Sequence, residues 1–283
     1  MITVRLSGGM GNQMFQYATG RALAVKYDVP LRLDTTYLLD RTPRSNFTFR
    51  EYDLDVFCVQ AEVISSQKSS WQLKVEKIKN KLLRPRGVEK SFSFDPTVLS
   101  WGPEVTLQGY WQSPKYFSEI EDVIRADFTL NHPLPENTKT LLAEIQSTAS
   151  VAIHVRRGDY VGHAFHDIDL GQSYYDAGLR HITSKHAIEK IYAFSDDIEW
   201  CKTNLHFDIV TTFVGPEYAG QKGEEHLMLM SACRHFIIAN STFSWWGAWL
   251  CTNSEKIVVA PRQWFKDTSI DTDDLIPSEW LRL

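Results

Sequence analysis

The sequence has no cysteine pair at the spacing of a metal or redox motif, and it has no excess of positive charge. Its four cysteines are scattered without a CxxC pattern, which excludes a zinc ribbon and a thioredoxin-like site. They predict buried thiols in a reducing compartment. The formal net charge of -5 provides no basic field, so nucleic acid is not predicted as a partner.

Long apolar runs are also absent. No segment approaches the ~20 apolar residues of a membrane helix, and the chain begins MITVRL without a basic and then apolar leader. We therefore expect a cytoplasmic protein with no transmembrane segment. Peripheral association with a membrane stays open, and the sequence does not define the oligomeric state. No fixed-period repeat interrupts the 283 residues, a length that favours one large or two medium domains.

The first 27 residues have the pattern of a strand, a turn and a helix. Ile2 to Leu6 is predicted as a strand, Ser7 to Gly11 as a glycine-rich turn, and Asn12 to Tyr27 as a helix. A second strand is expected at Pro30 to Leu33 and a polar helix at Ser66 to Leu83.

The second half alternates strands with helices, which predicts a parallel sheet that binds ligands at the carboxyl ends of its strands. Polar Asn131 to Asn137 is the candidate linker, so we expect α/β domains at 1–133 and 134–283. The predicted strands are Val151 to His154, Lys190 to Phe194, Asp208 to Thr212, Phe236 to Ala239 and Lys256 to Ala260. The predicted helices are Tyr174 to Lys185, Ile198 to Leu205, Glu224 to Cys233 and Phe243 to Cys251.

Two arginines follow the first strand of that half. His154, Arg156, Arg157 and Asp159 stand at its carboxyl end. Paired guanidiniums suit a phosphate, because each donates parallel hydrogen bonds and keeps its charge at any working pH. Asp159 is expected to hold one arginine in place. A surface salt bridge on a turn is the alternative.

A second polar cluster opens a predicted helix after an apolar strand. Its residues Ser241, Thr242 and Ser244 are placed to bind the same phosphate, because helix N-termini carry unpaired N–H groups and a positive dipole end. Ordinary N-capping by a hydroxyl is the alternative.

The glycine-rich turn near the N-terminus matches neither a dinucleotide fingerprint nor a P-loop, because Met14 stands where the third glycine is required and no Gly-Lys-Ser/Thr follows. Gly11 still allows a close backbone approach, and the amides of Asn12 and Gln13 lie at a helix start. A plain tight turn is the alternative.

Two carboxylates, Asp196 and Asp197, end another strand of the second half. One of them is a candidate to accept the N1–H and N2–H donors of guanine, although capping of the helix from Ile198 explains them equally well.

Metal-like patterns are weak in this sequence. Asp271-Thr272-Asp273 follows no clear strand, and His163 and His166 lack a third ligand nearby. We predict no metal and no cofactor.

Four motifs in order resemble the bacterial α-1,2-fucosyltransferases of polysaccharide synthesis, relatives of the Golgi enzymes that make the H determinant. They are SGGMGNQMFQYA at 7–18, GYWQSPKYF at 109–117, HVRRGDY at 154–160 and NSTFSWWGAWL at 240–250. The resemblance implies a GT-B arrangement of two facing, Rossmann-like α/β domains. The acceptor would lie mainly on the N-terminal domain and GDP-fucose mainly on the C-terminal one.

The resemblance also implies residue roles. Arg156 would bind the β-phosphate with His154 and Asp159 beside it, and Asn12 would be a further pyrophosphate contact. Ser241 and Ser244 would form the helix-start phosphate site, and Asp196 or Asp197 would recognise guanine.

The implied reaction transfers L-fucose from GDP-β-L-fucose to the 2-OH of a terminal β-galactose with inversion, in O-antigen or oligosaccharide synthesis. The expected partners are GDP-fucose and a galactose-terminated glycan. Another linkage, or a non-catalytic nucleotide-sugar or glycan-binding protein, stays open as an alternative.

Overall fold

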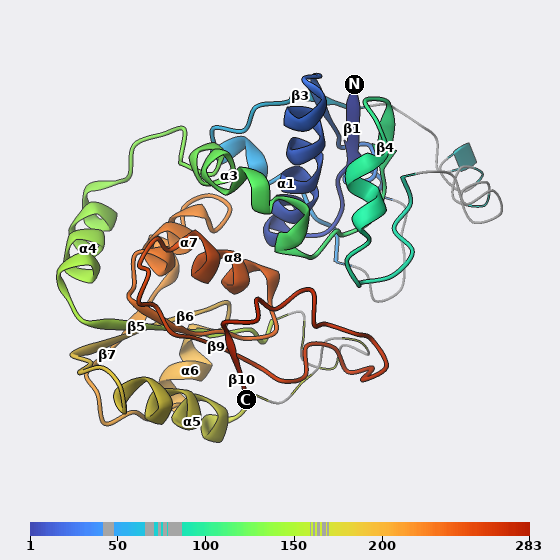
Figure 1. The fold of residues 1–283 in the computed structure, drawn as a ribbon. Coiled ribbons are helices and arrows are strands. Elements are labelled where there is room, and N and C mark those ends of the chain that lie inside the picture. The colour runs from blue at the N-terminus through green and yellow to red at the C-terminus, as the bar shows by residue number, and fades with distance from the viewer. Residues whose placement is uncertain are drawn as a thin grey trace. The chain divides into compact units, whose positions relative to one another are not determined.

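The computed structural model describes residues 1–41, 48–65, 71, 72, 75, 78, 87–158, 160, 162, 165, 168 and 170–283. The chain divides into two compact units (Figure 1), one made of Met1–Asn131 with Asp271–Pro277 and the other of His132–Ile270 with Ser278–Leu283. The first change of unit lies two residues before the boundary that the sequence suggests. The return of Asp271–Pro277 to the first unit was not predicted.

The first unit is built on a parallel sheet of four strands in the order β3-β2-β1-β4. The strands are β1 Ile2–Arg5, β2 Leu31–Asp34, β3 Glu62–Ile64 and β4 Val105–Leu107. Helix α1, Met10–Tyr27, is buried along most of its length. It packs closely on β1, because a Cβ added at Gly20 would lie 2.2 Å from Val4 Cγ2.

Short helices complete this unit after β2 and around β4. They are the 3-10 helices η1 Leu54–Val56, η2 Pro96–Ser100, η3 Pro114–Tyr116 and η4 Ser118–Ile120, and the α-helix α3 Glu121–Asp127.

The second unit has a parallel sheet of six strands in the order β10-β9-β8-β5-β6-β7. The strands are β5 Ser150–Val155, β6 Lys190–Ser195, β7 Thr211–Val214, β8 His235–Ile237, β9 Val258–Ala260 and β10 Leu281–Arg282. Apolar β5 is wholly buried because helices cover both faces of the sheet.

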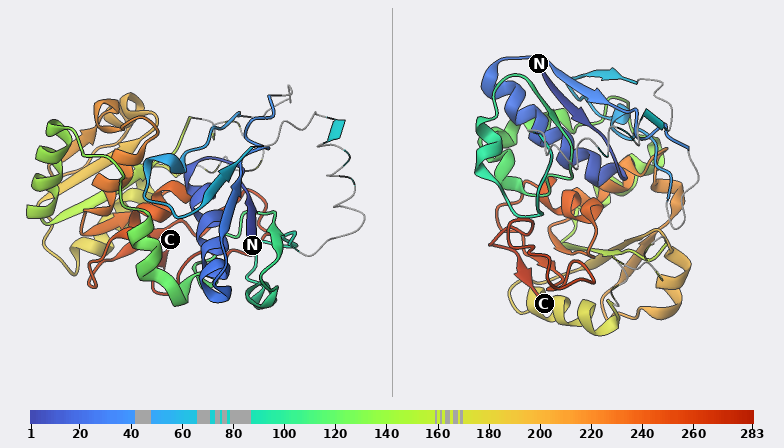
Figure 2. Two further views of the ribbon diagram at one scale, coloured as in Figure 1. Left: turned by 90° about the horizontal axis from the view of Figure 1, so that it is seen from above. Right: turned by 90° about the vertical axis from the view of Figure 1, so that its right-hand side faces the viewer.

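Its helices are α4 Glu136–Ser147, α5 Gln172–Thr183, α6 Ile198–Asn204, α7 Glu224–Ser231 and α8 Thr242–Leu250, with the 3-10 helix η5 Pro216–Tyr218. Figures 1 and 2 show α5 and α6 on one side of this sheet and α4, α7 and α8 on the other. Ile153 of β5 packs in one cluster with Leu179 of α5 and Cys201 of α6.

The α/β class with parallel sheets is confirmed, and several predicted ends are wrong. Helix α1 starts at Met10 because extended Gly9 already accepts the N–H of Gln13. Strand β7 lies at Thr211–Val214, later than predicted, because its pairing with β6 sets its ends. Helix α4 begins at Glu136, inside the predicted linker. The predicted helix at 66–83 falls mostly outside the described residues, and the facing arrangement stays a prediction.

All four cysteines are free thiols, and three of them are buried as predicted. Cys58 is half-buried. No helix in the described part of the chain is long and apolar enough to cross a membrane.

Candidate active site

The carboxyl end of β5 lies in the middle of the second sheet, between β8 and β6. His154 belongs to this strand, and Arg156 and Arg157 follow it directly. In a parallel sheet, the loops that follow the carboxyl ends of the strands converge on one side, and ligands bind there. The fold therefore places the two predicted phosphate-binding arginines where such a site is expected.

Asp196 lies at the carboxyl end of the neighbouring strand β6. It contacts the turn after β5 that carries Arg156 and Arg157. Its Oδ2 lies 3.2 Å from Arg156 Nη1, and its Oδ1 accepts the backbone N–H of Arg157 at 2.9 Å. A Cβ added at Gly158 would meet Asp196 Oδ2 at 2.4 Å. A side chain at position 158 would therefore push the Asp196 carboxylate away from the turn.

Arg157 is fixed by a second carboxylate and by an aromatic ring. Its Nε lies 3.4 Å from Asp197 Oδ2, and its guanidinium carbon lies 3.8 Å from the centre of the Trp200 ring. Asp197 Oδ1 also caps α6 by accepting the N–H of Trp200 at 3.2 Å. The helix-capping interpretation is therefore confirmed for Asp197. Asp159, predicted to hold an arginine, lies outside the described residues.

His154 is buried at the same edge, with only 4% of its surface exposed. Burial, reinforced by the positive charge of Arg156 and by His226, lowers the pKa of His154 to about 3. Its Nδ1 has no hydrogen-bond partner among the described residues. His154 is therefore a neutral imidazole at physiological pH, able to take part in a hydrogen bond but not to supply positive charge.

Helix α8 begins beside this histidine, because the rings of His154 and Phe243 lie 5.9 Å apart. Its N-cap residue, Ser241, is buried and makes no side-chain capping bond. The Ser244 hydroxyl is fully buried and donates to the carbonyls of Ala239 and Ser241. Of the predicted phosphate contacts, the half-buried Thr242 and the backbone of this first turn are better placed than the Ser244 side chain.

The glycine-rich turn belongs to the first unit and follows β1. Gly8 has φ of 76°, and a Cβ there would lie 2.4 Å from Asn12 Nδ2. Gln112 Nε2 donates to Asn12 Oδ1 at 2.9 Å, which orients the amide. Gly11 is buried in the first turn of α1. The predicted contacts Gly11 and Asn12 therefore lie in the first turn of α1. The N–H groups of Asn12 and Gln13 already donate to Gly9 O at 3.0 and 3.1 Å, so the positive dipole end of the helix is what would favour an anion here.

The side chains of two buried glutamines support this turn, a role that was not predicted. Gln13 Nε2 donates to the carbonyls of Gly8 at 2.9 Å and Glu51 at 2.7 Å. Gln16 Nε2 donates to Gly109 O at 2.9 Å and to Ser7 Oγ at 3.0 Å. Both side chains are fully buried. The available signal was a polar residue at a helix position that faces the core.

The structure does not support a metal site at the metal-like sequence patterns. Asp271 Oδ1 accepts the N–H of Asp273 at 2.9 Å, as in an ordinary turn. His163 and His166 lie outside the described residues. Within the described ranges, no group of three or more His, Cys, Asp and Glu side chains could hold a metal ion. Transfer without a metal stays a prediction.

Comparison with known proteins places the chain among sugar transferases. A family model described as "Glycosyl transferase family 11" matches residues 89–283. The chain is 31% identical to an alpha-1,2-colitosyltransferase of Escherichia coli, covering 100% of this chain and 99% of that one. It is also 31% identical to the O-antigen biosynthesis glycosyltransferase WbnK of Escherichia coli, covering 98% and 99%. Identity to the galactoside 2-alpha-L-fucosyltransferase Sec1 of Mus musculus is 25%, covering 92% and 67%.

Proposed function

Because the chain belongs to glycosyl transferase family 11, we propose that it transfers L-fucose from GDP-β-L-fucose to the 2-OH of a terminal β-galactose. The observation that carries this proposal is the arginine pair at the carboxyl end of β5, held by Asp196 and Asp197. The name of one relative, an O-antigen biosynthesis glycosyltransferase, supports a role in O-antigen or oligosaccharide synthesis. The name of another, a galactoside 2-alpha-L-fucosyltransferase, supports the donor sugar and the linkage.

The proposed reaction is a single displacement with inversion. The acceptor oxygen bonds to the anomeric carbon as the bond from that carbon to the β-phosphate oxygen breaks, and GDP leaves with the electron pair. Negative charge then develops on the pyrophosphate. Fixed donors stabilise such charge most effectively, and Arg156 is held by Asp196 before the substrate arrives. The first-turn amides of α8 would add further donors.

The acceptor hydroxyl must lose its proton in the same step. Asp159 is our candidate for the base. His154 is neutral and buried beside Arg156, which suits a role in orienting the donor by a hydrogen bond. We expect no metal ion, because two guanidiniums already supply positive charge to the pyrophosphate.

A second candidate is transfer of colitose with the same linkage, because one relative that matches the whole chain is an alpha-1,2-colitosyltransferase. Colitose is fucose without its 3-hydroxyl. The two donors therefore differ by one polar group. A site that hydrogen-bonds this hydroxyl would strongly reject the donor that lacks it.

The test is a donor and acceptor matrix. Purified protein is incubated with GDP-L-fucose, GDP-L-colitose or GDP-mannose and a panel of β-galactosides, and the product linkage is determined by NMR. We expect fucose α-linked to the 2-OH of galactose. A 3-, 4- or 6-linkage would contradict the regiochemistry, and preference for GDP-colitose would favour the second candidate. Binding of GDP-fucose without transfer or hydrolysis would indicate a non-catalytic binding protein.

A further inference from the structure

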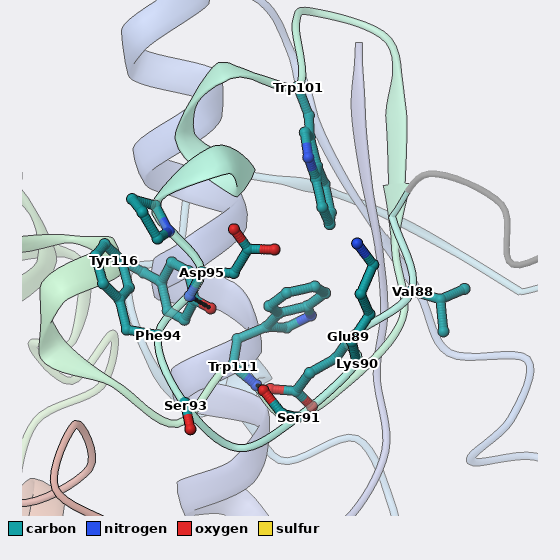
Figure 3. A pocket seen from close by; sticks show the side chains of 11 residues that line it. Val88, Glu89, Lys90, Ser91, Ser93, Phe94, Asp95, Trp101, Trp111 and Tyr116 are labelled. Carbon is teal, nitrogen blue, oxygen red and sulfur yellow. Dashed lines mark hydrogen bonds between the residues drawn. The ribbon is translucent and has the colours of Figure 1, made fainter.

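The first unit contains a small cavity walled by aromatic rings and edged by charged side chains (Figure 3). Its volume is about 210 Å³, below the range typical of drug-sized ligands. The walls that matter here are Trp101, Trp111 and Tyr116, and the charged groups are Glu89, Lys90 and Asp95. None of these residues belongs to the arginine site.

The aromatic walls form a connected set with fixed geometry. The rings of Trp101 and Trp111 lie 5.8 Å apart at 83°, and those of Trp111 and Tyr116 lie 5.7 Å apart at 87°. Edge-to-face contacts of this kind are favourable. The Tyr116 hydroxyl oxygen also accepts the N–H of Asp95 at 2.9 Å, which ties the acidic segment to the wall.

Glu89 fixes the backbone that carries the central ring. Its two carboxylate oxygens accept the N–H groups of Tyr110 at 2.7 Å and Trp111 at 2.8 Å. A Cβ at Gly109 would lie 2.3 Å from the Glu89 Cβ, so only glycine fits beside this carboxylate. Trp111 has a positive φ of 56°, which non-glycine residues rarely adopt. Such strain persists where the surroundings impose it, and it clusters at functional sites.

The indole of Trp111 carries an unused donor. Only 1% of the residue is exposed, and Nε1 has no hydrogen-bond partner in the described part of the chain. Buried polar groups are normally paired. An unpaired donor on a residue that lines a cavity is satisfied when a ligand with a hydrogen-bond acceptor enters.

The charged groups favour a neutral, hydroxyl-rich ligand. In Figure 3 the Asp95 carboxylate and the ammonium end of Lys90 lie near the rings of Trp101 and Trp111. Both hydrogen bonds that Asp95 accepts from Thr97 go to Oδ1. The bond from the Thr97 hydroxyl lowers the pKa of Asp95, so this group is ionised and disfavours an acidic sugar. Carboxylates and ammonium groups form strong hydrogen bonds with hydroxyls.

We propose that this cavity binds one neutral sugar ring of the acceptor glycan, with its apolar C–H face on the tryptophans and its hydroxyls on Asp95, Lys90 and the Trp111 indole. Aromatic walls with a few convergent polar groups are typical of small-molecule sites. The proposal rests on the proposed function, because that function supplies a saccharide substrate. It adds a binding site and residues outside the arginine cluster.

Indole N–H resonances provide a direct test. The ¹⁵N-labelled chain is titrated with methyl β-galactoside and with N-acetyllactosamine. The cross-peaks of Trp101 and Trp111 are assigned with the substitutions Trp101→Phe and Trp111→Phe. We expect both peaks to shift with one saturable Kd. Trp71, which is 72% exposed and lies outside the cavity, is the internal control and should not move.

The variant Asp95→Asn keeps an oxygen for the Thr97 bonds and loses the charge. It should raise the saccharide Kd about tenfold, as expected for one charge-assisted hydrogen bond, and retain the thermal shift produced by GDP. Stationary Trp101 and Trp111 peaks at saccharide concentrations that saturate transfer, or an unchanged Kd in Asp95→Asn, would overturn the proposal.

GDP-fucose turnover, measured separately, distinguishes the two proposals. Saccharide binding at Trp111 without any turnover would refute the proposed function and leave the cavity assignment standing. Turnover with no response from Trp111 would refute the cavity assignment and leave the proposed function standing.

Discussion

The substitution Asp196→Asn should lower kcat more than it raises the KM for GDP-fucose. Asp196 contacts Arg156 Nη1 at 3.2 Å and the N–H of Arg157 at 2.9 Å. Asparagine keeps an acceptor for that N–H and loses the ion pair. Arg156 would keep its charge but lose the partner that holds it, so the stabilisation of the leaving pyrophosphate should decrease.

The expected changes in melting temperature and in kcat follow from the exposure of the ion pair and from the role of Arg156. The side chains of Arg156 and Asp196 are 22% and 24% exposed, so the ion pair contributes at most ~1 kcal/mol to stability. The melting temperature should fall by only roughly 2–4 °C. Complete loss of a donor to a developing charge lowers kcat about 10²- to 10³-fold. A loosened Arg156 should give a loss of about tenfold, or ~1.4 kcal/mol.

The assay measures kcat, the KM for GDP-fucose and the thermal shifts produced by GDP and ADP, with Asp197→Asn as the matched control. If Asp196 instead accepts the guanine donors, kcat will be nearly normal, the KM for the donor will rise, and the difference between GDP and ADP will vanish. That pattern would refute the positioning role. The sequence interpretation of Asp196 as a guanine reader would then be the better one.

Three further predictions concern the same edge of the sheet. Arg156→Lys should lose nearly as much kcat as Arg156→Ala, at least about 10²-fold, because lysine lacks the planar fork; near-normal turnover of folded Arg156→Lys would contradict this. The folded-state pKa of His154 is about 3, below the unfolded value of ~6.5. The contribution of neutral His154 to stability is therefore present above pH ~6.5 and is lost as the pH falls towards 3. The free energy of unfolding should decrease by up to ~1.4 kcal/mol per pH unit in this range. Urea unfolding at several pH values should give a flatter profile for His154→Leu, and identical slopes would exclude this origin. Activity should survive EDTA, and loss that Mg²⁺ or Mn²⁺ restores would disprove metal independence.

The second unit was largely predictable because its strands are apolar and its helices are periodic. The order from β5 to β9 follows the alternation of the sequence closely. The strands β3 and β4 were missed because each has three residues, one of them polar, and therefore little apolar pattern. The equally short β8 and β9 were predicted because each lies in a longer apolar run. Strand ends such as those of β7 depend on the partner strand, which local sequence does not reveal.

The candidate site was predictable in its residue types and less so in its contacts. The arginines could be placed at a strand end, but their partners could not be chosen from sequence, because Asp196 and Asp197 are 40 residues away from Arg156 and Arg157. The contacts around the cavity in the first unit could not be predicted from sequence either. Glu89 contacts Tyr110 and Trp111 only through the fold, and nothing in the local sequence marks Trp111 as a strained residue.

The folding of the first unit must wait for the synthesis of the seven residues Asp271–Pro277. They belong to the unit that otherwise ends at Asn131, and Asp274 accepts the N–H of Phe94 at 2.8 Å and pairs with Lys115. On the ribosome, at ~5–20 residues per second, residue 271 appears roughly 7–28 s after residue 131. The first unit therefore acquires its last native contacts only after residues 132–270 of the second unit have been made. Until then the Phe94 N–H and the Lys115 ammonium lack their contacts with Asp274, so a chaperone or the ribosome surface encounters an incomplete form of this unit.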